Sequence, residues 1–562
     1  MATIIDTSAS SSFNASLTWL PLIFFATVLL ILWRIQQRSR FYRLGNKIPG
    51  PPALPLFGNA LLALGVKPEQ ILETALNYGQ QYGDVVRGWL GTKLAIFLVN
   101  PDDVEVILNS QVHIEKSSDY RFFKPWLGEG LLISSGKKWR SHRKMIAPTF
   151  HINILKSFIP IFNQNSKNVV KKMKTEVGKT FDVHEYMSGV TVDILLETAM
   201  GITRKTQDES GFDYAMAVMK MCDIIHQRHY KFWLRLDFMF KFSSFFKKQA
   251  NLLGIIHGLT NKVIKYKKEI YYENKAKGFI PPTIEELTRE DVVENVLLND
   301  DKTYSDAVFK GYRDDLDFND ENDIGEKKRL AFLDLMIESA QNGTNNISDH
   351  EIKEEVDTIM FEGHDTTAAG SSFVLCLLGV HQDIQARVYD ELYEIFGDSD
   401  RPVTFADTIE MKYLERVILE TLRMFPPVPA IARKLNRDVQ IATKDYILPA
   451  GATVVIGTYK IHRNPKYYKD PDTFNPDNFL PENTQNRHYY SFIPFSAGPR
   501  SCVGRKYALL KLKVLLATIL RNFKTVSEIK DSDFKLQVDI ILKRSDGFRI
   551  KLEPRNRKPS KC

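Results

Sequence analysis

A ten-residue loop near the end of the chain constrains it more than any other feature. The loop runs Phe495-Ser-Ala-Gly-Pro-Arg-Ser-Cys-Val-Gly504 and holds Cys502 between two glycines, two residues after Arg500. Glycines let a backbone fold closely around a ligand atom. A helix predicted to start just after Cys502 would aim free N–H groups and its positive dipole end at the sulfur, which favours a thiolate. Thiolates bind metals, although most single cysteines in intracellular chains are inert buried thiols.

A second pattern predicts a long helix with a polar centre. Ser348-Asp-His-Glu351 is a capping box, flanked by Ile347 and Ile352 as a hydrophobic staple, and the apolar pattern continues to about Val380. The hexapeptide Glu362-Gly-His-Asp-Thr-Thr367 lies near its middle. Polar groups inside a buried helix are costly, and threonine can bend a helix by bonding to the preceding turn. Taken alone, the hexapeptide fits either a functional site or a satisfied polar patch.

Together, the two patterns resemble the cytochrome P450 haem-thiolate monooxygenases. All five fixed positions of that family's loop, Phe-x-x-Gly-x-Arg-x-Cys-x-Gly, are present, from Phe495 to Gly504. The resemblance implies an α-rich fold with a small β lobe, a haem b cofactor with Cys502 as its axial iron ligand, and a haem propionate bound by Arg500. It also implies that Thr366 lies beside bound O2 and that Asp365 helps to relay protons. His364 is then expected to pack or to face solvent.

Shorter motifs extend the resemblance. Trp139 and Arg143, at i and i+4, match the family's propionate-binding pair, and Arg433 is expected as a third partner. Glu420-Thr-Leu-Arg423 matches the Glu-x-x-Arg ion pair near the thiolate loop. The family usually completes this pair with an arginine, but here the run reads Pro476-Asp-Asn-Phe479. Either a neutral hydrogen bond from Asn478 or another basic residue such as Arg487 would fill that role.

Glu362 narrows the resemblance to family 4, some members of which esterify this glutamate to a haem methyl group. Three stretches further resemble the insect long-chain aldehyde oxidative decarbonylases: MFEGHDTTAAGSS, DNFLPENTQNRHYYSFIPFSAGPRSCVGRKYA and the acidic insertion before the long helix. That resemblance implies conversion of a long-chain aldehyde into a cuticular hydrocarbon one carbon shorter. A fatty-acid ω-hydroxylase is the alternative enzyme. A haem-binding sensor without turnover is the alternative of another class, which the acid–alcohol pair disfavours.

The N-terminal region predicts a membrane anchor. Residues 17–33 form an apolar run without a charge, and arginines and Lys47 follow it. The positive-inside rule then places residues 1–16 in the lumen of the endoplasmic reticulum and the remaining chain in the cytosol. A cleaved signal peptide would instead carry its basic residues before the apolar run. Residues 34–58 are predicted to be a basic, proline-rich linker, and residues 59–562 to be one catalytic domain.

Charge and composition bear on partners. The chain carries a net charge of +8, whereas residues 285–326, predicted to be an acidic surface insertion, hold 15 acidic and 4 basic residues. No nucleotide-binding glycine motif is present, so electrons from NADPH require a separate reductase, NADPH–cytochrome P450 reductase. Nucleic-acid binding is not indicated. The basic residues predicted to form the reductase-docking face are Lys137, Lys138, Arg140, Lys144, Arg505, Lys506, Lys511 and Lys513.

Periodicity gives the coarse order of elements. Residues 85–99 predict a strand, a turn and a strand; residues 137–280 and 328–425 predict helices; and residues 428–505 predict strands and loops. An aromatic and basic patch over 231–246 fits either core packing or shallow contact with a membrane surface.

Overall fold

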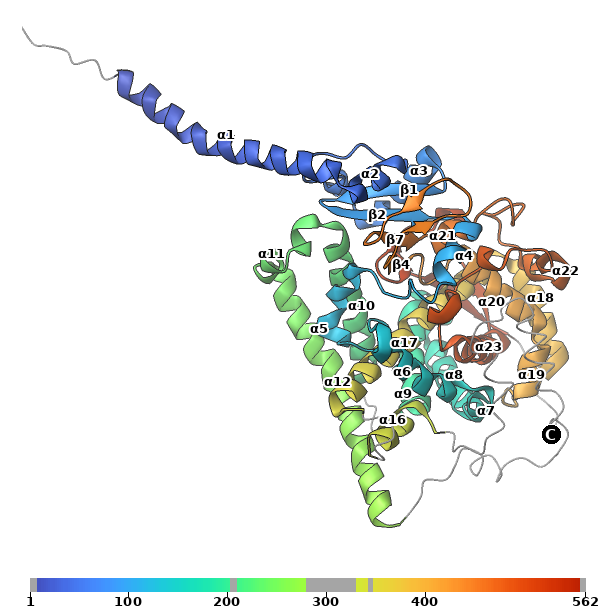
Figure 1. The fold of residues 1–562 in the computed structure, drawn as a ribbon. Helices are drawn as coiled ribbons and strands as arrows, with labels where there is room; N and C mark the ends of the chain where they lie inside the picture. Colours follow the sequence, from blue (N-terminus) through green and yellow to red (C-terminus); the bar gives the residue numbers. More distant parts are fainter. Residues whose placement is uncertain (1–7, 203–209, 279–329, 342–346, 556–562) are drawn as a thin grey trace, which may run out of the picture.

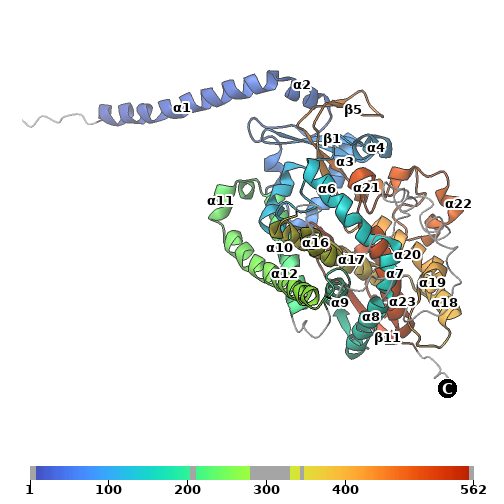
Figure 2. The same ribbon diagram turned by 60° about the horizontal axis from the view of Figure 1, so that its bottom comes forward.

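A computed structural model describes residues 8–202, 210–278, 330–341 and 347–555 (Figure 1). Helices form most of the body, and a small sheet lies at the end from which the N-terminal helix projects (Figures 1 and 2). The acidic insertion predicted over 285–326 lies outside the described residues.

The helices fall largely in the ranges that periodicity predicts. They are α1 Ser8–Arg38, α2 Arg40–Lys47, α3 Ile71–Tyr82, α4 Pro101–Leu108, α5 Lys124–Leu127, α6 Gly136–Ile146, α7 Ile152–Ser157, α8 Ile159–Met173, α9 Val183–Thr198, α10 Ser210–Tyr230, α11 Asp237–Lys241, α12 Ser244–Ala276, α16 Phe332–Gln341, α17 Asp349–Val380, α18 Gln382–Phe396, α19 Phe405–Glu410, α20 Lys412–Met424, α21 Thr458–Ile461, α22 Pro481–Thr484 and α23 Arg505–Asn522.

Within the described ranges, the strands form four small sheets. They are β1 Val85–Leu90, β2 Lys93–Leu98, β3 Thr180–Asp182, β4 Ile431–Lys434, β5 Val439–Gln440, β6 Ile447–Leu448, β7 Thr453–Ile456, β8 Phe523–Val526, β9 Leu536–Val538, β10 Leu542–Arg544 and β11 Arg549–Pro554. The predicted strand pair over 85–99 is confirmed as β1 and β2, which continue through β7 to β4. β2 pairs with β7 in parallel, whereas β4 pairs with β7 antiparallel.

The segment predicted as a spacer packs on this sheet. The ring of Tyr42 stacks on Trp89 with centroids 4.0 Å apart. The backbone N–H of Arg87 donates to the carbonyl of Pro49 at 2.8 Å. This part of the predicted linker therefore packs against the sheet lobe.

Helix α17 runs through the centre of the body. Its predicted capping box is confirmed, because Ser348 and Glu351 bond each other's backbone N–H groups, and both staple isoleucines, Ile347 and Ile352, are buried. Most residues of α17 are buried, and it packs against α9, α20 and α23. A helix that is covered on all sides needs apolar residues around its whole circumference. Polar residues in its sequence are therefore unusual and easily recognised.

Helix α23 corrects one expectation. Its basic residues were predicted to form part of a solvent-facing docking surface, yet Lys511 is 0% exposed, Lys513 is 2% exposed and Arg505 is buried. Each ammonium has an internal acceptor: Lys513 contacts Glu415, and Lys511 bonds a backbone carbonyl. Of the predicted docking residues, Lys137, Arg140 and Lys144 on α6 are exposed, and Lys506 on α23 is half-buried.

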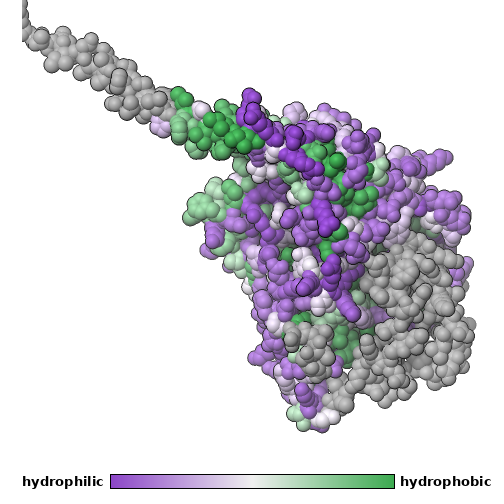
Figure 3. All heavy atoms as spheres, in the orientation of Figure 1, coloured by the Kyte–Doolittle hydropathy of each residue, from purple (hydrophilic) through white to green (hydrophobic). Residues whose placement is uncertain are grey.

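The N-terminal helix α1 contains the predicted span over 17–33. No helix in the described part of the chain is long and apolar enough to cross a membrane, so the span stays a prediction. Around α11 the surface is apolar (Figure 3), with Phe238 70% and Phe242 79% exposed, while Phe240 is buried. Core packing therefore accounts for only part of the 231–246 patch.

Candidate active site

A cavity of about 460 Å³ lies between α17, the β4 strand and the cysteine loop. Most of its wall is apolar, contributed by leucine, isoleucine, valine, proline and phenylalanine side chains. The cavity brings together seven residues that the sequence singled out: Trp139, Arg143, Glu362, Thr366, Phe495, Arg500 and Cys502. Arg433 lies on β4 beside the cavity, and Asp365 does not line it.

The cysteine loop has a tight, fixed shape. The N–H of Cys502 donates to the carbonyl of Phe495 at 2.9 Å, which closes the loop. Gly498 has φ +68°, and a Cβ there would lie 2.1 Å from the carbonyl oxygen of Leu108, so only glycine fits. Helix α23 begins at Arg505, close after the cysteine, as predicted. The loop therefore presents the Cys502 sulfur to the cavity.

The sequence predicts a thiolate at Cys502, but the polypeptide alone favours the neutral thiol. Cys502 is exposed to the cavity, yet the surrounding body, followed by the nearby Glu362 carboxylate, raises the pKa of its thiol to about 11, and the backbone N–H of Gly504 opposes this only in part. The helix end therefore does not suffice to make a thiolate. A bound metal cation would supply the missing charge, because coordination deprotonates a thiol outright.

Several cations surround the cavity with few acids to neutralise them. Arg143 donates to the carbonyl of Ser501 at 2.8 Å, and Arg500 donates to the carbonyl of Ser134 at 2.8 Å. In the described ranges no carboxylate forms an ion pair with Arg433 or Arg500. Burial and then the charge of Arg433 lower the pKa of Arg500 to about 9. Mutually repelling buried cations are stabilised by an anionic ligand, so this set fits the two propionates of haem.

Sequence reasoning missed one member of this set, Lys116. It lines the cavity and forms an isolated β-bridge with Arg433. Burial and then Arg433 and Arg500 lower its pKa well below the usual lysine value. No local motif marks Lys116, because pairing with a strand more than 300 residues away brings it to the site. We include Lys116 among the residues that could hold a propionate.

Glu362 is the acid that faces these cations. Burial raises the pKa of its carboxyl to about 7, although the charge of Lys116 opposes the shift. The side chain lies on α17 and lines the same cavity as Cys502. The buried position in this cavity therefore favours the neutral acid.

The two residues of the acid–alcohol pair point in different directions. Thr366 lines the cavity, and its hydroxyl donates to the carbonyl of Glu362 at 2.8 Å. Asp365 lies behind the cavity wall, buried, with one carboxylate oxygen 3.8 Å from Lys543 Nζ. Burial alone would raise the pKa of Asp365, but Lys543 and two neighbouring histidines lower it. His364 packs inside the body, bonding the carbonyl of Met360 at 2.7 Å.

Replacing Lys543 by methionine should destabilise the protein at neutral pH, because it leaves the Asp365 carboxylate buried without its cation. Breaking a buried pair costs about 3–5 kcal/mol, and we expect a smaller loss here because the two groups share no direct hydrogen bond. Without Lys543, burial raises the pKa of Asp365, so the loss should shrink as the pH falls and the carboxyl takes up a proton. Guanidinium unfolding at several pH values tests this, with the exposed Lys535→Met as control. An equal loss at every pH would contradict it.

The Glu-x-x-Arg motif forms a fully buried ion pair. Arg423 Nε and Nη2 donate to the two carboxylate oxygens of Glu420 at 2.7 and 2.8 Å, and both side chains are 0% exposed. Asn478 Nδ2 donates to Glu420 at 3.1 Å, and Arg487 bonds the backbone carbonyl of Asn478. Of the two alternatives, the structure therefore has the neutral hydrogen bond, with Arg487 supporting Asn478.

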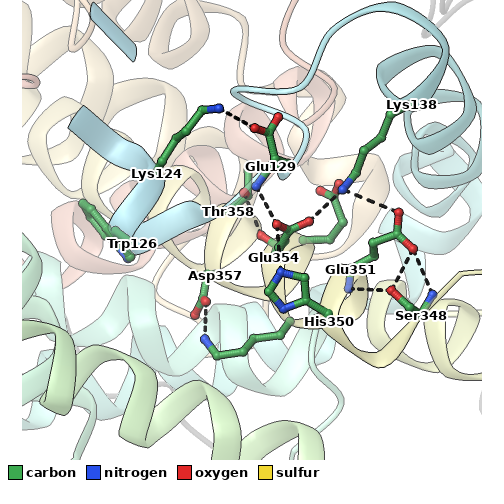
Figure 4. Close-up of polar contacts among 12 residues, drawn as sticks. Lys124, Trp126, Glu129, Lys138, Ser348, His350, Glu351, Glu354, Asp357 and Thr358 are labelled. Carbon is green, nitrogen blue, oxygen red and sulfur yellow. Dashed lines mark hydrogen bonds and ion pairs between the residues drawn. The ribbon is translucent and has the colours of Figure 1, made fainter. Parts of the chain in front are cut away.

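A polar cluster joins α17 to the loop before α6. Glu354 accepts from the N–H of Glu129 at 2.7 Å and from Lys138 at 2.8 Å (Figure 4). One residue on, Glu355 accepts from the N–H of Leu131 at 3.0 Å and contacts a ring nitrogen of His142 at 2.7 Å. These bonds fix α6, and with it Trp139 and Arg143, against the helix that carries Glu362.

Comparison with known proteins agrees with this site. The family "Cytochrome P450" matches residues 48–552. The chain is 56% identical to cytochrome P450 4g15 of Drosophila melanogaster over 93% of this chain and 95% of that protein. It is 51% identical to cytochrome P450 4g1 of the same organism over 98% of both chains, and 38% identical to human cytochrome P450 4V2 over 94% of both.

The chain therefore belongs to the cytochrome P450 family and, within it, to family 4. It is a haem-thiolate monooxygenase, and this class uses haem, O2 and electrons from a redox partner. The fold is the mostly helical P450 fold with a small β region.

Proposed function

We propose that this monooxygenase converts long-chain fatty aldehydes into hydrocarbons one carbon shorter, for the cuticle. The observation that carries the proposal is the mostly apolar lining of the cavity beside Cys502, to which α17 also contributes the polar side chains of Glu362 and Thr366. Such a cavity suits a long aliphatic chain with one polar end. The resemblance of three stretches to the insect decarbonylases supports the choice of an aldehyde.

Within this proposal the site residues divide into three groups. Cys502 would ligate the haem iron, with Phe495 closing its loop. Trp139, Arg143, Arg433, Arg500 and Lys116 hold the propionates. When bound, haem supplies the activation of O2. Thr366 presents a hydroxyl to the cavity, and the Asp365 carboxylate, held by Lys543, lies behind the cavity wall as the proposed proton relay.

The fatty-acid ω-hydroxylase is the second candidate, because the same apolar cavity accepts a fatty acid. Incubating the purified enzyme with an NADPH-dependent reductase, octadecanal and octadecanoic acid in separate reactions separates the two. We expect gas chromatography to show heptadecane from the aldehyde, with little ω-hydroxy acid from the acid. Only ω-hydroxy product would overturn the proposal, and no NADPH consumption with either substrate would favour the non-turnover sensor.

We also propose a location and a partner. A single-pass anchor over 17–33, with residues 1–16 lumenal, would hold the catalytic part on the cytosolic face of the endoplasmic reticulum. The exposed aromatics of α11 support a second, shallow membrane contact. The exposed cations Lys137, Arg140 and Lys144 support docking of an acidic NADPH–cytochrome P450 reductase.

We propose that Glu362 forms an ester with a haem methyl group: a carboxyl oxygen replaces one methyl hydrogen, and peroxide made from O2 and two reductase electrons takes up the two electrons and two protons that are released, giving two waters. Its carboxyl lines the cavity together with Cys502, and its raised pKa makes the neutral acid available near pH 7. Acidic organic extraction of denatured enzyme should leave part of the haem on the polypeptide, and Glu362→Ala should release all of it. Mass spectrometry of the peptide that contains Glu362 checks the linkage. Complete extraction from active unmodified enzyme would contradict the ester.

A further inference from the structure

Lys511 is a buried cation without an acid. Its side chain is 0% exposed, and in the part of the chain that the structure describes no carboxylate lies within ion-pair distance of its Nζ. The ammonium donates to the carbonyl of Gly363 at 2.8 Å and lies 4.9 Å from the ring centre of Tyr507. Burial of an unpaired charge is among the most costly arrangements in a protein interior.

Another buried lysine on α23, Lys513, does have an acid as its partner. Lys513, two residues further along α23, is 2% exposed, and its ammonium contacts Glu415 and the carbonyl of Thr408, both at 2.7 Å. Lys511 has no such acid, and burial alone lowers its pKa to about 7. A buried lysine without a paired acid does not stabilise the fold, so a functional role is the better explanation for it.

The hydrogen-bond acceptor of Lys511 indicates what its role is. Gly363 lines the cavity directly after Glu362, and its carbonyl also accepts from the hydroxyl of Thr367 at 3.0 Å. Lys511 itself lies on the helix that begins just after Cys502. The hydrogen bond from the Lys511 ammonium therefore connects α23 to the cavity wall, at the turn of α17 that carries Thr366.

We propose that Lys511 is a positioning residue that fixes the Gly363 carbonyl in the cavity wall and supplies a positive charge that favours addition of an electron to the haem. A fixed charge in a dry interior acts strongly, because little solvent screens it. The proposal depends on the haem cofactor of the family and not on the substrate, so its failure would leave the proposed aldehyde reaction untouched.

Lys511→Met in the full-length holoenzyme tests the proposal through the haem reduction potential, measured by spectroelectrochemistry at slightly acidic pH. We expect about a tenfold loss in the reduction equilibrium, which is about 59 mV toward lower potential for a one-electron couple. Hydrogen exchange of the peptide covering 362–368 should become faster, because its anchored carbonyl is released. Lys511→Gln keeps a donor but no charge, so it should lower the potential similarly.

Lys513→Met is the matched control, since it removes a buried lysine from the same helix. It should lower the thermal unfolding midpoint by leaving Glu415 unpaired, while the haem potential stays unchanged. Lys511→Met should leave the unfolding midpoint the same or higher. An unchanged potential in both Lys511 variants would overturn the proposal, and so would an equal potential shift in Lys513→Met, which would mark a general disturbance of α23. If Lys511→Met fails to retain haem, Lys511→Gln decides.

Discussion

Replacing Cys502 by serine is expected to abolish the thiolate-type absorption band of the reduced carbon-monoxide complex and all monooxygenase activity. The expectation rests on the loop geometry, in which the N–H of Cys502 bonds to Phe495 and the sulfur faces the cavity. A serine keeps this backbone bond, so the loop should survive while the ligand sulfur is lost. The electronic push of a thiolate on haem iron disappears with it.

Two controls separate ligand loss from unfolding. Cys376 is buried in α17, and burial raises the pKa of its thiol to about 12, so Cys376→Ser should keep the thiolate-type band in whatever fraction folds. Circular dichroism of Cys502→Ser should match that of the unmodified protein. A thiolate-type band that persisted in Cys502→Ser would place the iron ligand elsewhere.

Local motifs were predictable because the residues that form each of them are close together in the sequence. The capping box of Ser348 and Glu351, the i, i+4 pair on α6, the strand pair after residue 85 and the helix following Cys502 all depend on neighbouring backbone atoms. Each carries its signal in residue spacing, so the structure places these elements where the pattern predicted them.

Long-range partners were not predictable. Lys116 reaches the cavity through a bridge to β4, and Lys543 reaches Asp365 from the C-terminal hairpin. Lys511 looked like a solvent-facing residue because its acceptor is a backbone carbonyl, which leaves no trace in the sequence. The charge state of Cys502 was not predictable either: the helix end after it favours a thiolate, but the surrounding body and the nearby Glu362, which the sequence does not place, raise the pKa of the thiol.

Arg423→Met is expected to reduce the free energy of unfolding by about 3–5 kcal/mol, the usual cost of leaving one partner of a buried ion pair alone. Arg423 bonds both oxygens of Glu420 and also donates to the carbonyls of His462, Pro471 and Thr473. Without it, the hydrogen bonds left to Glu420 among the described residues come from the N–H of Asn475 and from the amide of Asn478. Guanidinium unfolding monitored by circular dichroism, together with the rate of haem loss, measures the effect.

The partly exposed pair Arg401–Asp407 provides the matched control. Arg401 is 40% exposed on its side chain, whereas Arg423 is fully buried, so Arg401→Met should cost less than Arg423→Met although Arg401 also bonds both oxygens of its aspartate. Adding Glu420→Gln to Arg423→Met should recover part of the lost stability, because the neutral amide ends the burial of an unpaired charge and can still accept from Asn478. This recovery would show that the cost arises from the orphaned carboxylate. A loss in Arg423→Met as small as that in Arg401→Met would mean that the pair does not hold the core behind the cysteine loop.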